Sequence, residues 1–414
     1  MTRRLAYALL AMTAGQAAVY IARPTTSYRL LSLGYDARAV GLVAAAYALL
    51  PLVAAIPLGR YSDRRHAGSL IAAGSGFQVA ACVLLAVADT ALALAIASTV
   101  LGLGHLAVAL GVQDVIARES PPDRHDQHFG LLTAGVSLGQ LVGPLIAGVI
   151  LGNRGGAALT DATSRAMLAG AAIAAGAAIC GILAQRRQPA GRFVPPRETR
   201  SGSVRTILAT AGVPAGIFAS IAVLSAADIF TAYLPVLGDE RGIAPGTIGV
   251  LLAVRAASSM AARLGIGGIV TWVGRMRLIT LSAFVAGLAF CGVALSGNVA
   301  ILAILSLVAG FALGFGQPLS MTLVAQLVPQ HARATALSVR ISGNRISQIA
   351  APAAAGLVAG AAGAAAPFWL LAALLAASGL VLQRLPAAGS IIGESTSELD
   401  GAHDERGPPA ATST

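Results

Sequence analysis

The sequence predicts an all-α membrane protein with twelve transmembrane helices, arranged as two parallel six-helix bundles. Hydrophobic residues make up 56% of the 414-residue chain and charged residues 11%, well below the roughly 25% charged residues of soluble domains. Apolar stretches of about 20 residues, the length that crosses a bilayer core, recur between short polar breaks. The two halves of the chain also repeat each other at a spacing of 208 residues.

The polar breaks delimit twelve predicted spans. In chain order they cover residues 5–27, 40–58, 68–88, 91–116, 129–151 and 166–185, and then 207–234, 247–266, 278–296, 299–327, 335–359 and 367–384. We therefore expect an N-terminal bundle over 1–185, a Pro- and Arg-rich linker over 186–206 and a C-terminal bundle over 207–385. The polar tail, 386–414, has too few apolar residues to fold alone.

Glycine positions reveal the internal repeat. Adding 208 to eight first-half glycines reaches a glycine each time, whereas chance would give about two such coincidences; the pairs are Gly34/Gly242, Gly41/Gly249, Gly59/Gly267, Gly102/Gly310, Gly135/Gly343, Gly148/Gly356, Gly152/Gly360 and Gly155/Gly363. Each half holds six predicted helices, an even number, so both copies enter the membrane in the same orientation. This is a parallel repeat about an axis along the membrane normal.

The distribution of arginine predicts the topology. All 28 basic residues are Arg, and a cytoplasmic N-terminus places 18 of them in cytoplasmic segments, 5 in outward loops and 5 within spans. The positive-inside rule then places both termini in the cytoplasm of a cell with the chain in its inner (plasma) membrane. Nucleic-acid binding by the Arg-rich linker is the alternative, but the linker is short and ends a helix, which favours a topological role.

Several chemical functions find no support in the sequence. The three cysteines each lie in a predicted span, at spacings that suit neither a disulfide nor a metal site. The segment DRHDQH, residues 123–128, has metal-ligand residue types but fits a solvated loop better. We expect no enzyme, no metal and no cofactor other than a proton gradient, and a monomer whose partners are a small-molecule substrate, protons and lipid.

The loop after the second span carries a recognisable motif. In GRYSDRRHAG, Gly59 is followed by Asp63 and Arg64, and the second half echoes the loop as GGIVTWVGRMR. This pattern resembles the major facilitator superfamily. The resemblance implies the twelve-helix fold of that superfamily, secondary transport by alternating access, and a conformational lock in which Asp63 docks near the eleventh helix and Arg64 pairs with Asp114. Ordinary positive-inside anchoring is the alternative interpretation.

The fifth span resembles the Gly-Pro motif of the superfamily's proton-coupled drug antiporters. In GVSLGQLVGPLIAG, Gly135, Gly139 and Gly143 line one helix face and are followed by Pro144. The resemblance implies export, whereas the alternative is a small-residue packing seam. One departure is Ser98, four residues before Gly102, where such antiporters usually carry an Arg. The proton-relay role of that Arg is therefore not transferred.

Ionisable residues within apolar spans need a cavity or a partner, because each costs about 2.5 to 3.5 kcal/mol on insertion scales. Asp228 lies deep in the seventh span, and Arg23 or Arg255 is positioned to neutralise it. Our hypothesis is that protonation of Asp228 couples to transport, since burial favours the neutral carboxyl and a neighbouring Arg favours the ionised one. A permanently ionised structural pair is the alternative.

Further polar residues predict a substrate cavity near the bilayer midplane, formed by Tyr20, His105, Gln140, Asn344, Arg345 and Gln348. Three arginines against one aspartate would suit an anionic substrate. Proton-coupled efflux of a small organic molecule is the first functional expectation. Proton-coupled uptake of an organic anion is the second, and a transport-dead sensor is the third.

Overall fold

The computed structural model describes residues 2–62, 67–121, 124–186, 204–329 and 332–385. The described chain is helical, without strands. The N half comprises α1 (Arg3–Ser32), α2 (Ala37–Ala46), α3 (Leu49–Tyr61), α4 (Ala67–Val87), α5 (Ala91–Glu119), α6 (His125–Leu151) and α7 (Gly156–Arg186). The C half comprises α8 (Val204–Ala209), α9 (Val213–Glu240), α10 (Pro245–Val273), α11 (Arg275–Leu295), α12 (Val299–Gln326), α13 (Arg333–Ala362) and α14 (Ala366–Gln383).

Eleven segments of the described chain are long and apolar enough to cross a membrane, with α2 and α3 together forming one of them. The remaining predicted span is α13, which carries the polar side chains of Arg340, Asn344, Arg345 and Gln348 and is not among these eleven segments. With α13 included, the helices follow the twelve predicted spans. The chain is therefore a multi-pass membrane protein.

Local sequence signals set many helix ends. The side chains of Thr2, Asp36, Thr90 and Asn298 accept hydrogen bonds from backbone N–H groups in the first turns of α1, α2, α5 and α12. The helices depart from the predicted spans in several places. The sixth span begins at Gly156 rather than near 166, the second is broken at Tyr47 and Ala48, and Gly212 with φ +84° separates α8 from α9.

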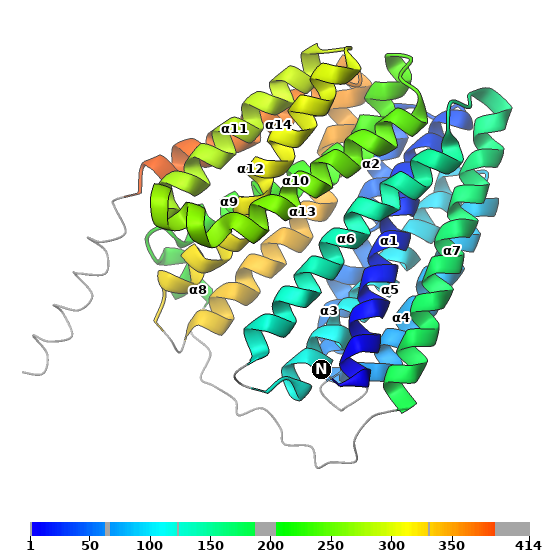
Figure 1. Cartoon of the computed structure of the whole chain (residues 1–414). Coiled ribbons are helices and arrows are strands. Elements are labelled where there is room, and N and C mark those ends of the chain that lie inside the picture. Colours follow the sequence, from blue (N-terminus) through cyan, green and yellow to red (C-terminus); the bar gives the residue numbers. More distant parts are fainter. Residues whose placement is uncertain (1, 63–66, 122–123, 187–203, 330–331, 386–414) are drawn as a thin grey trace, which may run out of the picture.

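The two halves lie side by side (Figure 1), with the start of α1, the end of α7, the start of α9 and the end of α14 at one end of the molecule. We call this the terminal end and the opposite one the far end. In the far-end half of the helices, α6 packs against α10 and α2 packs against α13. These two seams join the N half to the C half.

The seams are related by the repeat. Gly41 lies so close to α13 that a Cβ there would come within 2.5 Å of the Pro352 carbonyl oxygen, and a Cβ at Gly249 would come within 2.6 Å of the Pro144 oxygen. The two contacts are equivalent in the repeat, because Gly41 corresponds to Gly249 and Pro144 corresponds to Pro352, each pair 208 residues apart. The same relation links the Gly246 N–H bond to Gly152 O (2.8 Å) with the Arg38 bond to Gly360 O (3.3 Å). The halves thus meet through a pseudo-two-fold interface.

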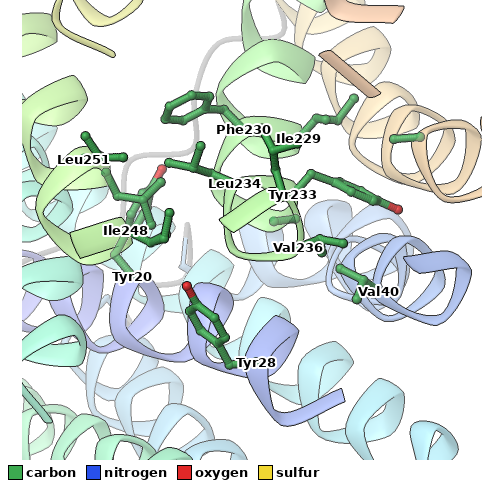
Figure 2. Close-up of a cluster of buried hydrophobic side chains, with 14 of the residues drawn as sticks. Tyr20, Tyr28, Val40, Ile229, Phe230, Tyr233, Leu234, Val236, Ile248 and Leu251 are labelled. Carbon is green, nitrogen blue, oxygen red and sulfur yellow. The ribbon is translucent and has the colours of Figure 1, made fainter. Parts of the chain in front are cut away.

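One cluster of buried side chains crosses that interface. Figure 2 shows Tyr28 of α1 and Val40 of α2 next to α9 residues that include Tyr233 and Val236. The Tyr233 hydroxyl donates to the carbonyl oxygen of Ala37 (3.0 Å), and Ser27 Oγ donates to that of Ala232 (2.9 Å). Apolar burial and backbone-directed hydrogen bonds therefore fix α9 against the N half at the far end.

Candidate functional site

A buried ion pair joins the two halves. Arg23 Nη1 of α1 donates to Asp228 Oδ1 of α9 at 2.6 Å, and the side chains are 11% and 6% exposed. The second carboxylate oxygen, Oδ2, accepts a hydrogen bond from Gln348 Nε2 of α13 at 3.2 Å. Of the two arginines that the sequence offered, Arg23 is the one that contacts Asp228. Three helices from both halves therefore meet at one carboxylate.

A polar chain leads from this pair into the N half. The Arg23 guanidinium lies over the Tyr47 ring, 5.0 Å from its centroid, and the Tyr47 hydroxyl is 2.6 Å from His105 Nδ1. The other ring nitrogen of His105 donates to Gln16 Oε1 at 2.7 Å. Tyr47 stands at the break between α2 and α3, so the helix interruption places an aromatic ring beneath the guanidinium.

The α13 residues divide between two surroundings. Arg345 Nη1 donates to Gln348 Oε1 at 3.1 Å, which makes Gln348 the link between Arg345 and Asp228. Asn344 instead faces α9, where its Oδ1 accepts from Ser220 Oγ at 3.0 Å. The polar stripe of α13 therefore serves both the central site and the packing of the C half.

Arg255 of α10 is buried without a charged partner. It is 4% exposed, its guanidinium lies 6.0 Å from the centroid of the Phe230 ring, and its Nε has no hydrogen-bond partner among the described residues. Tyr20 forms a side-chain hydrogen bond with it, and Tyr20, Asp228 and Arg23 are its electrostatic neighbours. The ion pair of Asp228 with Arg255 that the sequence allowed is not formed in this structure.

A small cavity borders Arg23 and Tyr47 on their far-end side. Its remaining walls are Thr26, Ser27, Leu30, Val40, Val43, Ala44, Ser98, Leu101 and Ala232. Ser98 is thus a wall residue of the same cavity as Arg23. The cavity gives the ion pair a partly polar neighbourhood.

Two predicted cavity residues make no hydrogen bond to Arg23, Asp228 or Gln348 within the described chain, although Tyr20 hydrogen-bonds Arg255. Tyr20 is buried on α1, where Gly143 of α6 packs against it. Gln140 of α6 is half-buried and makes no hydrogen bond within the described chain. His105 and Gln140, which the sequence placed together, are thus not joined by a hydrogen bond within the described chain.

The loop motif is only partly described. Gly59 lies in the last turn of α3, with no atom within 4 Å of an added Cβ, whereas Asp63 and Arg64 lie outside the described residues. Asp114 accepts a hydrogen bond from Arg118 of its own helix at 2.5 Å, and its Oδ2 is buried without a partner among the described residues. In the segment 123–128, Asp123 also lies outside the described residues, while His128 is buried and bonded to Ser120 (2.7 Å).

The glycine face of α6 packs against α1. Gly135 faces Thr13, Gly139 faces Gln16, and Gly143 faces Tyr20, each too closely for an added Cβ. Pro144, next to this face, lies on the α10 seam. All four residues of the motif therefore lie at close interhelical contacts.

Sequence reasoning missed Gln16 and Tyr47. Neither is charged, so neither is conspicuous within an apolar span. The repeat carried one usable signal, because adding 208 to Tyr47 gives Arg255. A polar residue at both equivalent positions indicates that they share an environment.

Comparison with known proteins agrees with this architecture. The family model of the Major Facilitator Superfamily matches residues 7–300 and 216–398. A bacterial homologue of the human lysosomal transporter Spinster, described as inward-facing and unoccupied, aligns with a TM-score of 0.71 at 16% identity over 99% of this chain and 100% of that one. A D-xylose-proton symporter aligns with a TM-score of 0.73 at 14% identity over 93% and 97%.

The nucleoside transporter NupG is also similar, with a TM-score of 0.68 at 14% identity over 93% of this chain and 100% of that one. No curated protein matches the sequence. These identities are low, so the structural matches support the fold and the family match supplies the membership. The chain therefore belongs to the Major Facilitator Superfamily of secondary transporters.

Proposed function

We propose that this chain is a proton-coupled secondary transporter of a small organic molecule, with Arg23 and Asp228 as its coupling pair. The observation that supports this is the position of the pair: one residue comes from each half, and both are buried within membrane spans. Alternating access moves the halves against each other around a central site. A pair that crosses the halves is therefore sensitive to that movement.

The proton has a physical role in this cycle. A carboxylate that loses its arginine partner inside a membrane span is strongly destabilised, and taking up a proton removes the charge. Separation of Arg23 from Asp228 would thus favour protonation, and their contact favours ionisation. The proton affinity of Asp228 would differ between the two conformations, which is what coupling to a gradient requires.

The described contacts between the halves support an inward-facing state. They lie in the far-end half of the helices or near the centre, where Arg263 Nη1 donates to Ser137 Oγ at 3.2 Å. With both termini cytoplasmic in an inner (plasma) membrane, as the arginine distribution indicates, the closed end faces outward. The similar Spinster homologue is likewise described as inward-facing.

Two directions of transport are open to such a protein. Export in exchange for protons, as in drug antiporters, has the resemblance of the α6 glycine face as its support, although packing against α1 accounts for those glycines. Uptake of an organic anion together with protons is the second candidate. It is favoured by the guanidinium groups of Arg255 and Arg345 beside the coupling pair.

The coupling proposal is tested in proteoliposomes of the full chain. The substrate is a compound found by its stabilisation of the purified protein in a thermal-shift screen, and its flux is measured with an imposed pH gradient. Asp228→Asn should abolish gradient-driven flux but retain counterflow exchange. Asp161→Asn, at an exposed position of α7, is the matched control. Full gradient-driven flux in Asp228→Asn would refute the coupling role.

A further inference from the structure

We propose that the substrate is an organic anion whose acidic group binds Arg255 and Arg345, and that it binds together with a proton on Asp228. This inference rests on the proposed transport function and names its substrate class. It follows from the charges of the central site, from the hydrogen-bond partners of each arginine and from the distance of Arg255 from either membrane surface.

The central spans hold more positive charge than negative. The described residues at or near the centre include five arginines, Arg23, Arg255, Arg263, Arg340 and Arg345. Of these, only Arg23 lies within ion-pair distance of a described acidic side chain, which is Asp228. The acids at the terminal end of α5, Asp114 and Glu119, pair with Arg118 and Arg4. Four central guanidinium groups thus lack a described counter-ion.

Arg255 lacks a counter-ion and keeps one donor unsatisfied within the described chain, although Tyr20 hydrogen-bonds its side chain. Its side chain is buried, its Nε donor has no described acceptor, and an aromatic ring covers one face. Leaving a buried charged donor without an acceptor is costly. A carboxylate or phosphate oxygen offers the charge and the acceptor that this group lacks.

Arg255 does not reach the membrane surface by extending its side chain. It lies ten residues from Pro245, where α10 begins, which is about 15 Å along the helix at about 1.5 Å per residue. The other end of α10 is further away. A charged side chain this deep in a membrane span is energetically costly, and anchoring at the membrane surface does not explain its presence. We therefore assign Arg255 a functional role.

Arg345 provides the second contact. It is half-buried, and its described hydrogen-bond partner is the neutral side-chain oxygen of Gln348, which itself donates to Asp228. Arg23 is already neutralised by Asp228. Before the proton binds, the acidic group of an arriving substrate therefore finds its available charges at Arg345 and Arg255.

The remaining arginines favour entry of an anion from the terminal end. Arg340 donates to Gln317 and Ser320, and Arg263 donates to Ser137, all neutral partners. Both arginines lie on the terminal-end side of Arg345 and Arg255 along α13 and α10. Charges of one sign gathered on neighbouring helices raise the local concentration of the opposite ion. A cationic substrate would be repelled along the same path.

The sign of the coupling follows from the groups around Asp228. These are Arg23 and Tyr20 from α1, Tyr47 from the α2–α3 break, His105 from α5, Arg255 from α10, and Arg345 and Gln348 from α13. A substrate anion added beside the Asp228 carboxylate disfavours its ionised form, so a proton moves from water onto the carboxylate. By reciprocity the proton favours the anion. Anion and proton therefore bind together, as in a symporter.

The substrate class is tested by thermal-shift and calorimetric binding to the purified full chain. The probes are matched sets that share a skeleton, such as benzoate, benzamide and benzylamine, and succinate with its diamide. Carboxylates should bind, whereas amides and amines should not. Arg345→Gln and Arg255→Gln should each weaken carboxylate binding about tenfold or more, and Arg255→Lys should retain part of it. Arg165→Gln, at an exposed position of α7, should leave binding unchanged.

Proton linkage is read in weakly buffered solution with a pH indicator. Binding of the carboxylate should take up protons, and Asp228→Asn should abolish that uptake. Binding of amines or amides in preference to carboxylates, binding by no probe, unchanged binding in both arginine variants, or proton release would each overturn the inference. A neutral substrate carried by a proton gradient through Asp228 would overturn it while leaving the proposed function intact. Carboxylate binding without gradient-driven flux would refute the proposed function and leave the inference about the binding site intact.

Discussion

Tyr47 and Arg255 occupy equivalent positions in the two halves, 208 residues apart, and the backbone carbonyl of each lies against a glycine, Gly102 for Tyr47 and Gly310 for Arg255. The two glycines are themselves 208 residues apart. The repeat therefore conserves the backbone approach and varies the side chain. One half supplies an aromatic ring under Arg23, and the other supplies a buried guanidinium.

Two variants of Tyr47 distinguish the hydrogen bond of its hydroxyl group from the contact of its ring with Arg23. Tyr47→Phe removes the hydroxyl that bonds His105 but keeps the ring beneath Arg23, whereas Tyr47→Leu removes both. We expect Tyr47→Leu to lower substrate-coupled proton flux more than Tyr47→Phe, because a cation–π contact contributes about 0.5 to 2 kcal/mol. The measurement is pH-gradient-driven flux in proteoliposomes. Equal losses in both variants would show that the hydroxyl, and not the ring, is what matters.

The far-end seams should open as a unit. Gly249→Val places a methyl-bearing side chain against the Pro144 carbonyl, and overpacking of this kind costs about 1 to 3 kcal/mol. Because rigid halves separate at both seams together, we expect faster hydrogen exchange in the α2 segment 37–46, which lies on the other seam. Exchange is measured by mass spectrometry of the protein in detergent.

Gly267→Val is the matched control, since Gly267 lies on the same helix with no neighbouring atom within 4 Å of an added Cβ. Faster exchange confined to α6 and α10 in Gly249→Val would mean that the two seams open independently. The pseudo-two-fold interface would then be a packing relation without a mechanical consequence.

The far end of the N half is fastened by Arg29. Its buried guanidinium donates to the carbonyl oxygens of Ala88 and Thr160 and to Ser164, and it pairs with Asp89. We expect Arg29→Gln to lower stability by about 2 to 3 kcal/mol, because it removes charged donors from buried acceptors. Asp89→Asn should cost less than about 1 kcal/mol, since its side chain is 76% exposed. Thermal unfolding in detergent compares the two, and similar losses would contradict this assignment.

The sequence contained the spans and the repeat because hydropathy and glycine spacing are one-dimensional signals. It predicted fewer of the contacts between side chains on different helices. Asp228 and its two possible partners could be named, but the choice of Arg23 depends on how α1 crosses α9. The link through Gln16, His105 and Tyr47 depends on the break after Ala46. Pro51 is the local signal for that break, because it has no N–H to bond the carbonyl of Tyr47 four residues earlier, but the predicted span ran through it. The start of α7 was placed too late because Thr160, Asp161 and Arg165 make its first turns polar.

The ion pair itself should show strong coupling in a double-mutant cycle of Arg23→Gln and Asp228→Asn. Each single change leaves one buried partner unmatched, and breaking a buried pair costs about 3 to 5 kcal/mol, whereas removing both charges is far less costly. The double variant should therefore unfold close to the wild-type temperature. In Arg23→Gln the loss should be larger at about pH 8 than at about pH 5, because protonation removes the unpaired charge of Asp228.

The pH dependence distinguishes a coupling carboxylate from a structural one. If the loss in Arg23→Gln is the same at both pH values, Asp228 stays ionised without its arginine, and the remaining bond from Gln348 must hold the charge. A carboxylate held so firmly would not exchange its proton when the halves separate. Additive losses in the double variant would lead to the same conclusion by another route, because they would mean that neither charge depends on the other.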